Sequence, residues 1–144
     1  MTLNEEIKEQ VIQLCGCKAI VDDWGEVADE LSRSFEWVGS KIRWSTVKAH
    51  KSSELKGGYN NWLDQIKEFI SISDIDSEIN NSDEIYYIND SSLDFSVHIE
   101  PSLFYSFLDL VIKNIPQHHY FFDKEKKWCL VVSSEAYVDF GFPN

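Results

Sequence analysis

The sequence predicts an α+β domain in which an antiparallel sheet packs against helices. Helical spacing of apolar residues occurs early and midway in the chain, whereas strand-like segments dominate its end. Short polar turns separate the last three of these segments, so they should pair antiparallel as sequential neighbours. The chain has 144 residues, 43% hydrophobic and 14% aromatic, which suffices for one core. Because no repeat or linker appears, we expect residues 1–144 to form one domain, with helices on one face of the sheet.

The first third of the chain predicts two helices followed by short strands. Thr2 and Glu5 form a T-x-x-E capping box, and helical spacing of apolar residues then continues to Gly16. Asp22 or Asp23 can cap a second helix. Over 35–47 the pattern turns towards alternation, which predicts one or two strands.

The middle of the chain predicts a turn, a helix, a hairpin and another helix. The polar segment "HKSSELKGG" indicates a turn region at 50–58, and Asn60 or Asn61 then opens a helix. The segments "EIYYIND" and "LDFSVHIE" predict two strands joined by a short Asn-Asp-Ser-Ser turn. Pro101 begins a helix whose apolar face extends over 101–114.

Three strands should close the chain, with the sequences "QHHYFFD", "KWCLVVS" and "AYVDFGF". Successive strand residues point to opposite faces of a sheet. We therefore expect one face to carry Trp128, Leu130 and Val132, and the other to carry Cys129 and Val131.

The charge of the chain narrows the classes of partner. Its net charge is −12 and its pI is near 4.6, which repels nucleic acid and anionic lipid and attracts basic proteins. The N-terminus "MTLNEEIKEQ" lacks the basic and apolar regions of a signal peptide, and no apolar run approaches the roughly 20 residues of a membrane span. We expect a cytoplasmic protein that binds neither nucleic acid nor membranes; its oligomeric state stays open.

No pattern predicts a metal or a cofactor. The three cysteines, Cys15, Cys17 and Cys129, form neither a disulfide framework nor a CxxC motif, and no second ligand pair accompanies them. A calcium loop starting at Asp74 would need glycine at its sixth position and glutamate at its twelfth, and isoleucine stands at both. We expect buried or half-buried thiols and no bound ion.

No motif predicts catalysis either. His118 and His119 are adjacent on a predicted strand, so they point to opposite faces and cannot act on one substrate. Asp139 in "YVDFGF" lacks the other kinase segments, and Ser133 has no G-x-S-x-G context. The segment "KGGY" at 56–59 lacks the spacing of a phosphate-binding loop. We expect a protein that is not an enzyme.

The distribution of charge is the strongest functional signal. Residues 37–67 hold six bases against two acids, whereas residues 68–109 hold ten acids and no base. A solvated acidic face would explain such a run, but tyrosines among carboxylates also suit a surface that captures a basic protein. We expect one of the two adjacent tyrosines to be an exposed anchor. The predicted partner-binding residues are Asp74, Asp76, Glu78, Asp83, Glu84, Tyr86, Tyr87, Asp90 and Asp94.

The segments "DEIYYINDSSLDFSV" and "PQHHYFFDKEKKWCLVVSSEAYVDFGF" carry a resemblance over about half the chain. The chain resembles the small cytoplasmic immunity proteins encoded beside bacterial polymorphic or contact-dependent growth inhibition toxins. The shared features are its small size, its acidity, a strand that carries tryptophan and a final strand of aromatic and acidic residues. The resemblance implies stoichiometric binding to a cognate toxin encoded by a neighbouring gene, often a basic nuclease, and it assigns no individual residues.

Two other classes stay open. The chain could be a small ligand-binding domain or enzyme, with a pocket between the helix at 101–114 and the sheet lined by Trp128, Tyr120 and one histidine. It could also be an adaptor unconnected with toxins.

Overall fold

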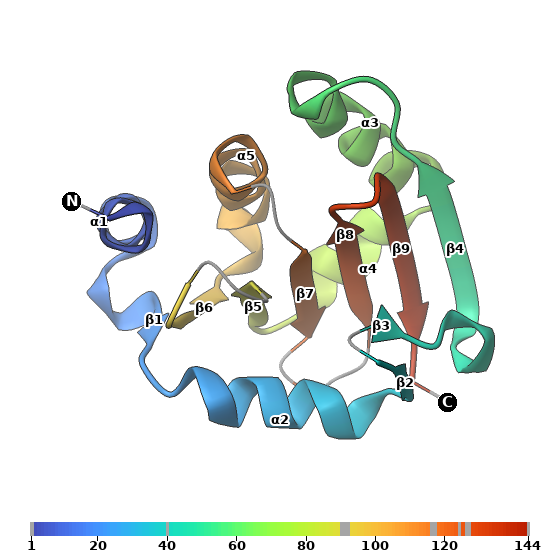
Figure 1. Cartoon of the computed structure of the whole chain (residues 1–144), viewed down its shortest axis with the longest axis horizontal. Helices are drawn as coiled ribbons and strands as arrows, with labels where there is room; N and C mark the ends of the chain where they lie inside the picture. Colours follow the sequence, from blue (N-terminus) through green and yellow to red (C-terminus); the bar gives the residue numbers. More distant parts are fainter. Residues whose placement is uncertain are drawn as a thin grey trace.

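The computed structural model describes residues 2–39, 41–89, 93–115, 118–123, 125 and 128–143. It shows the predicted α+β fold, with a seven-stranded antiparallel sheet in the order β1-β6-β5-β7-β8-β9-β4 and a separate β2–β3 hairpin (Figure 1). The helices are α1 (Leu3–Cys15), α2 (Trp24–Ser34), α3 (Tyr59–Ile72), α4 (Ile75–Asn81) and α5 (Phe104–Asn114), with 3₁₀ turns η1 (Cys17–Ala19), η2 (Trp44–Thr46) and η3 (Pro101–Leu103). The strands are β1 (Ile20–Val21), β2 (Trp37–Val38), β3 (Lys41–Ile42), β4 (Lys48–Glu54), β5 (Ile85–Asn89), β6 (Ser96–Ile99), β7 (His119–Asp123), β8 (Cys129–Ser133) and β9 (Tyr137–Phe142).

The predicted meander at the end of the chain is confirmed. Strands β7, β8 and β9 pair antiparallel in sequence order, with Phe121 opposite Leu130 and Leu130 opposite Phe140. Leu130 and Val132, together with Trp128 just before the strand, belong to a large core on one face of the sheet, whereas Cys129 and Val131 belong to a smaller core on the other. The alternation therefore sorts the side chains as expected.

The expectation that helices cover one face was wrong, because both faces are covered. Helices α1, α3, α4 and α5 contribute to the large core, and α2 crosses the opposite face beside the β2–β3 hairpin (Figure 1). Val27 and Leu31 of α2 are buried in one cluster with Ile88 of β5 and Phe122 of β7. All five residues of β7 are buried, as in a strand with a protein layer on each side.

The helix caps of the first third form as predicted. The Thr2 hydroxyl accepts a hydrogen bond from the Glu5 amide, and the Glu5 carboxylate accepts one from the Thr2 amide. Helix α1 ends at Gly16, whose φ of 91° disfavours any residue with a side chain. Asp23, rather than Asp22, caps α2 by accepting a hydrogen bond from the Glu26 amide.

The turn predicted at 50–58 was wrong over most of its length. Residues 48–54 form β4, an edge strand that pairs with β9 and is exposed along all seven positions. Its sequence is polar because neither of its faces is covered, and lysines on an exposed edge also discourage further strand pairing. Between Lys48 and Lys51 the register shifts by one residue at Ala49, whose φ is 52°.

The acidic stretch contains a helix that the sequence pattern did not indicate. Helix α4 is short, and Ile75 and Ile79 anchor it in the large core at a spacing of four residues. The helix predicted to open at Asn60 or Asn61 begins at Tyr59, one or two residues earlier, after Gly58. The predicted hairpin is present as β5 and β6, and its turn at 90–92 lies outside the described residues.

Candidate functional site

The carboxylates on α4 and just after it form one acidic surface. Ile75 and Ile79 hold the inner side of α4 in the core, so the polar residues between and beyond them lie towards solvent. Asp74 and Asp83 are exposed, and Asp76 and Glu78 are half-buried. Within the described part of the chain, none of these four forms a salt bridge with lysine or arginine. We call Asp74, Asp76, Glu78 and Asp83 the α4 patch.

Backbone geometry fixes where the α4 patch begins. Asp74 adopts the left-handed conformation, with a φ of 58°, which aspartate tolerates better than most residues. Its amide donates to the Ser71 carbonyl, and its own carbonyl accepts a hydrogen bond from the Ser77 hydroxyl at 2.9 Å. The chain therefore turns sharply from α3 into α4. Glu125 of the β7–β8 turn lines a hollow with Glu78 and Asp83; Lys124, Lys126 and Lys127 of that turn lie outside the described residues.

Of the remaining predicted carboxylates that the structure describes, Glu84 faces His98 and Asp94 lies away from the α4 patch. Asp83 and Glu84 precede β5, whereas Asp94 precedes the antiparallel β6, so the two groups lie at opposite ends of the hairpin. Five strand residues separate those ends by about 17 Å. Glu84 lies 3.8 Å from Nδ1 of His98, and the Asp94 amide donates to Asn4 of α1. Asp90 lies outside the described residues.

The expected tyrosine anchor is not Tyr87. Its side chain is fully buried in the large core, and its hydroxyl lies 2.8 Å from Nδ1 of His119. Tyr86 points to the opposite face and is half-buried, with its ring packed against Phe122 and His98. Successive strand residues point to opposite faces, so the two rings diverge as predicted. Tyr86 packs against the small core and is therefore exposed only in part.

The exposed tyrosine beside the α4 patch is Tyr105, in the first turn of α5. It is 37% exposed. Partial burial raises its pKa above the ordinary value, and the nearby carboxylate of Asp76 raises the pKa further. The sequence did not single out Tyr105, because α4 meets η3, the turn that leads into α5, only through tertiary packing.

His119 is the buried member of the histidine pair. It is 2% exposed, and its Nε2 donates to the Ile115 carbonyl at 2.9 Å. That bond leaves Nδ1 to accept the hydrogen bond from the Tyr87 hydroxyl. Burial lowers the pKa of His119 to about 4. The residue is thus a neutral core histidine that ties β7 to β5 and to the end of α5.

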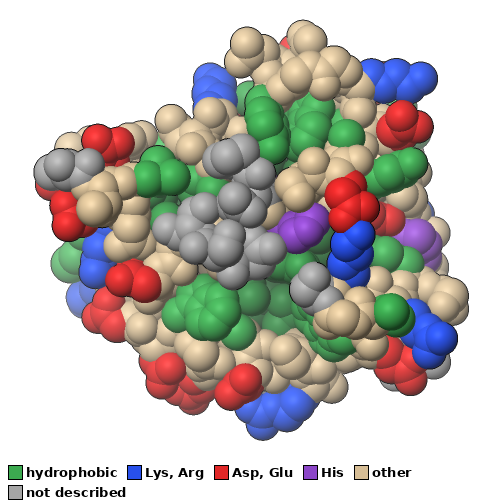
Figure 2. Space-filling view, in the orientation of Figure 1, with side chains coloured by type: hydrophobic (Ala, Val, Ile, Leu, Met, Phe, Trp, Pro, Cys, Tyr) green, Lys and Arg blue, Asp and Glu red, His purple; other side chains and the backbone are tan. Residues whose placement is uncertain are grey.

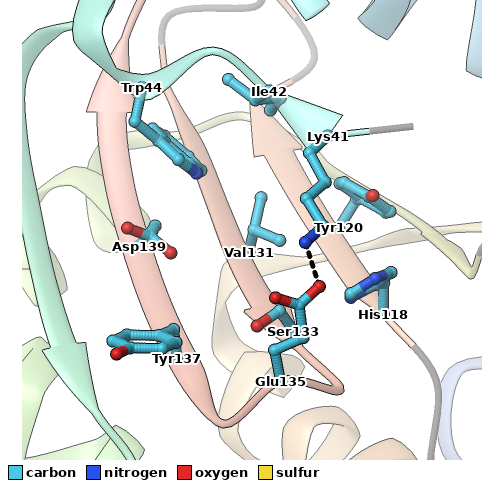
Figure 3. A pocket seen from close by; sticks show the side chains of 10 residues that line it. All are labelled: Lys41, Ile42, Trp44, His118, Tyr120, Val131, Ser133, Glu135, Tyr137 and Asp139. Atoms are coloured by element: carbon cyan, nitrogen blue, oxygen red, sulfur yellow. Dashed lines mark ion pairs between the residues drawn. The ribbon is translucent and has the colours of Figure 1, made fainter. Parts of the chain in front are cut away.

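The other face of the sheet holds a cavity of about 200 Å³ between the β2–β3 hairpin and strands β7–β9 (Figure 3). Its lining combines aromatic and aliphatic side chains with charged and hydroxyl groups (Figure 3). The lining residues are Lys41, Ile42, Trp44, His118, Tyr120, Val131, Ser133, Glu135, Tyr137 and Asp139.

One end of this cavity is built on Asp139 of β9. The side chain of Asp139 is 12% exposed, and its Oδ1 lies 2.8 Å from Nε2 of His50. His50 comes from the irregular stretch of β4, where the bulge at Ala49 displaces the register. The indole of Trp44 stacks on the His50 imidazole, with ring centres 4.9 Å apart and planes within 10°. The bulge and the stack together fix His50 against Asp139.

The other end of the cavity is closed by an ion pair. Lys41 of β3 bonds to Glu135 of the β8–β9 turn, so the pair links the small hairpin to the main sheet (Figure 3). The hydrogen bond from Lys41 and its positive charge hold the pKa of Glu135 below the ordinary value. Nδ1 of His118 accepts a hydrogen bond from the Ser134 amide at 3.1 Å.

The pocket predicted between the helix at 101–114 and the sheet was wrong in its lining. Trp128 packs in the large core with α5, and its indole N–H donates to Ser82. Tyr120 lies in the small core, on the opposite face. Because the two side chains are separated by the sheet, they cannot line one pocket; Tyr120 and His118 line the cavity described above instead.

In the described part of the chain, neither the cysteines nor any cluster of metal-binding side chains forms a further site. Cys129 is buried and Cys15 is half-buried, as predicted, but the prediction was wrong for Cys17, which is exposed on the 3₁₀ turn η1. Burial, and then the charge of Asp139, raises the pKa of Cys129 well above the ordinary value. Among the described residues, no group of three or more His, Cys, Asp or Glu side chains is placed to hold a metal ion. No helix in the described ranges combines the length and apolarity that crossing a bilayer requires.

No protein-family model matches the chain, and no curated protein is significantly similar to it in sequence. A fold class by itself does not specify a function, so the surfaces described above carry the functional inference.

Proposed function

We propose that this chain is an immunity protein of a bacterial contact-dependent growth inhibition or polymorphic toxin system. It binds a basic, nuclease-type toxin domain encoded by a neighbouring gene and neutralises it in the cytoplasm. The observation that carries the proposal is the α4 patch, four carboxylates on one short segment without a lysine or arginine partner among the described residues.

Electrostatics supports this pairing. A nuclease presents positive charge to phosphate, and an acidic inhibitor surface is complementary to that charge. Long-range attraction raises the association rate constant to about 10⁸ M⁻¹s⁻¹ or more at low salt, against about 10⁵–10⁶ M⁻¹s⁻¹ for uncharged surfaces. Tyr105 adds an exposed aromatic ring beside Asp76, which is the type of residue that most often anchors an interface.

The first experiment tests whether the chain binds the protein encoded by the adjacent gene. The chain and the protein encoded by the adjacent gene are co-expressed, and one of them is captured by an affinity tag. The proposal expects a stoichiometric complex and rescue of growth when the adjacent protein is toxic. Absence of both the complex and the rescue would refute the immunity function.

A matched pair of variants then tests the surface. In the patch variant the four α4-patch carboxylates become amides: Asp74→Asn, Asp76→Asn, Glu78→Gln and Asp83→Asn. The control variant removes the same charge from exposed positions on or near α1 and α2: Glu6→Gln, Glu9→Gln, Asp29→Asn and Glu36→Gln. Acidic side chains also gather over α1 and α2 in Figure 2, so the control removes charge from a second acidic region of the surface.

We expect the patch variant to associate with the toxin at least tenfold more slowly at low salt, and its rate to depend less on salt. The control variant should retain most of the wild-type rate. Equal slowing in both variants would mean that net charge, and not the α4 patch, attracts the partner. Tyr105→Ala should act mainly on dissociation, with a loss of about 2 kcal/mol in binding free energy.

A further inference from the structure

The cavity between the β2–β3 hairpin and strands β7–β9 lies on the face of the sheet opposite the α4 patch. Its two ends differ in the charged groups that they present. In Figure 3, Asp139 lies on β9 between Trp44 and Tyr137, and Val131 lies alongside on β8. The cavity therefore has one end where a carboxylate stands between two aromatic rings. Tyr137 is 44% exposed, so this end is open to a molecule approaching from outside.

The charges around the cavity leave that end negative. Lys41 and Glu135 form an ion pair at the far end, so their charges offset each other. The partner of Asp139 at this end is an imidazole: Nε2 of His50 donates a hydrogen bond to Oδ1 of the carboxylate at 2.8 Å. An incoming cation would meet Asp139 without displacing a lysine or arginine from it in the described part of the chain.

The size and shape of the cavity favour one side chain over a larger ligand. Its volume of about 200 Å³ is below the roughly 300–1,000 Å³ of typical small-molecule pockets. A guanidinium group is planar, stacks on aromatic rings and forms paired hydrogen bonds with a carboxylate. One face of the Trp44 indole is covered by the stacked imidazole of His50, which leaves its other face, together with the ring of Tyr137, for such stacking.

We propose that the Trp44–Asp139–Tyr137 end of the cavity receives the guanidinium group of an arginine side chain from the protein partner. The guanidinium lies between the two rings and bonds to Asp139. This inference rests on the proposed function for the identity of the partner, because a basic toxin is rich in such side chains. It assigns a second contact region, on the face of the sheet opposite α4.

The cavity can be tested without the partner. N-acetyl-L-arginine N-methylamide is titrated into the ¹⁵N-labelled chain at pH 7.5, and the amide signals of Tyr137 and Asp139 and the indole signal of Trp44 are followed. The matched probe is the citrulline derivative, which has the same shape and no charge. We expect saturable shifts of these signals with the arginine probe and at least tenfold weaker binding of the citrulline probe.

Two variants locate the site. Asp139→Asn keeps the shape and can still accept the hydrogen bond from His50, and it should weaken binding of the arginine probe by roughly tenfold. Tyr137→Ala removes an exposed ring, should leave the fold intact, and should weaken binding by roughly threefold or more. Asp83→Asn, in the α4 patch, is the control and should bind the probe as the wild type does.

Equal shifts with the citrulline probe, equal shifts with an N-acetyl-glutamate probe, or unchanged binding by both cavity variants would overturn the inference. If the adjacent protein does not bind the chain while the arginine probe does, the immunity function fails and the cation-binding cavity stands. If the adjacent protein binds and Tyr137→Ala and Asp139→Asn leave its dissociation rate unchanged, the cavity assignment fails and the immunity function stands.

Discussion

Acidification should destabilise the protein through His119. In the folded chain the imidazole is 2% exposed, donates to the Ile115 carbonyl and accepts from the Tyr87 hydroxyl. Burial lowers its pKa from the ordinary value of 6.5 to about 4. Protonation would place a charge in the core and turn Nδ1 from an acceptor into a second donor, opposite the Tyr87 hydroxyl.

The sign and size of the effect follow from proton linkage. Because the unfolded chain binds the proton more tightly, the contribution of His119 to stability is complete above pH 6.5 and falls as the pH drops towards about 4. Each pH unit between these values removes about 1.4 kcal/mol of unfolding free energy. Between pH 7 and pH 5 the expected loss from this one group is about 2 kcal/mol.

Denaturant unfolding of the wild type and of His119→Gln is measured at several pH values. The comparison separates the contribution of His119 to the unfolding free energy from the contributions of the carboxyl groups, which both proteins share. Their difference in unfolding free energy should shrink by about 2 kcal/mol from pH 7 to pH 5, because the variant has no proton to gain at this site. His98→Gln, which changes a part-exposed imidazole beside Glu84, serves as the control. Stability curves of wild type and His119→Gln that stay parallel over this range would refute the reasoning.

Three further predictions concern packing, backbone strain and thiol access. Gly141→Ala should cost about 1–3 kcal/mol of stability by thermal unfolding, because the added Cβ would lie 2.1 Å from Val47 Cγ1; Gly25→Ala, which meets no such contact, should cost nothing. Ala136→Gly should raise stability by about 0.5–1 kcal/mol, because Ala136 has a φ of 72°; an unchanged or lower melting temperature would contradict this. In a thiol-reagent assay, the exposed Cys17 should react at once and the buried Cys129 only on unfolding.

The elements that local sequence determines were predictable. The capping box at Thr2, the strand alternation around Leu130 and the hairpin of β5 and β6 depend on residues close in sequence, whose conformational preferences act before any tertiary contact forms. The same is true of the divergence of His118 and His119, which follows from the two-residue period of a strand. A short turn also forces antiparallel pairing, so the C-terminal meander needed no tertiary information.

Other features depended on contacts between distant segments. Strand β4 has no buried face, so no hydrophobic period marks it, and only its pairing with β9 makes it a strand. The site residues were decided in the same way. His50 meets Asp139 across 89 positions, and Tyr105 comes near Asp76 because η3, which leads into α5, packs on α4. The hairpin separates Asp94 from Asp83. The sequence by itself determined the acidic charge and the local elements. Only the tertiary structure decided which carboxylates share a surface, because that depends on strand order and on which face each helix covers.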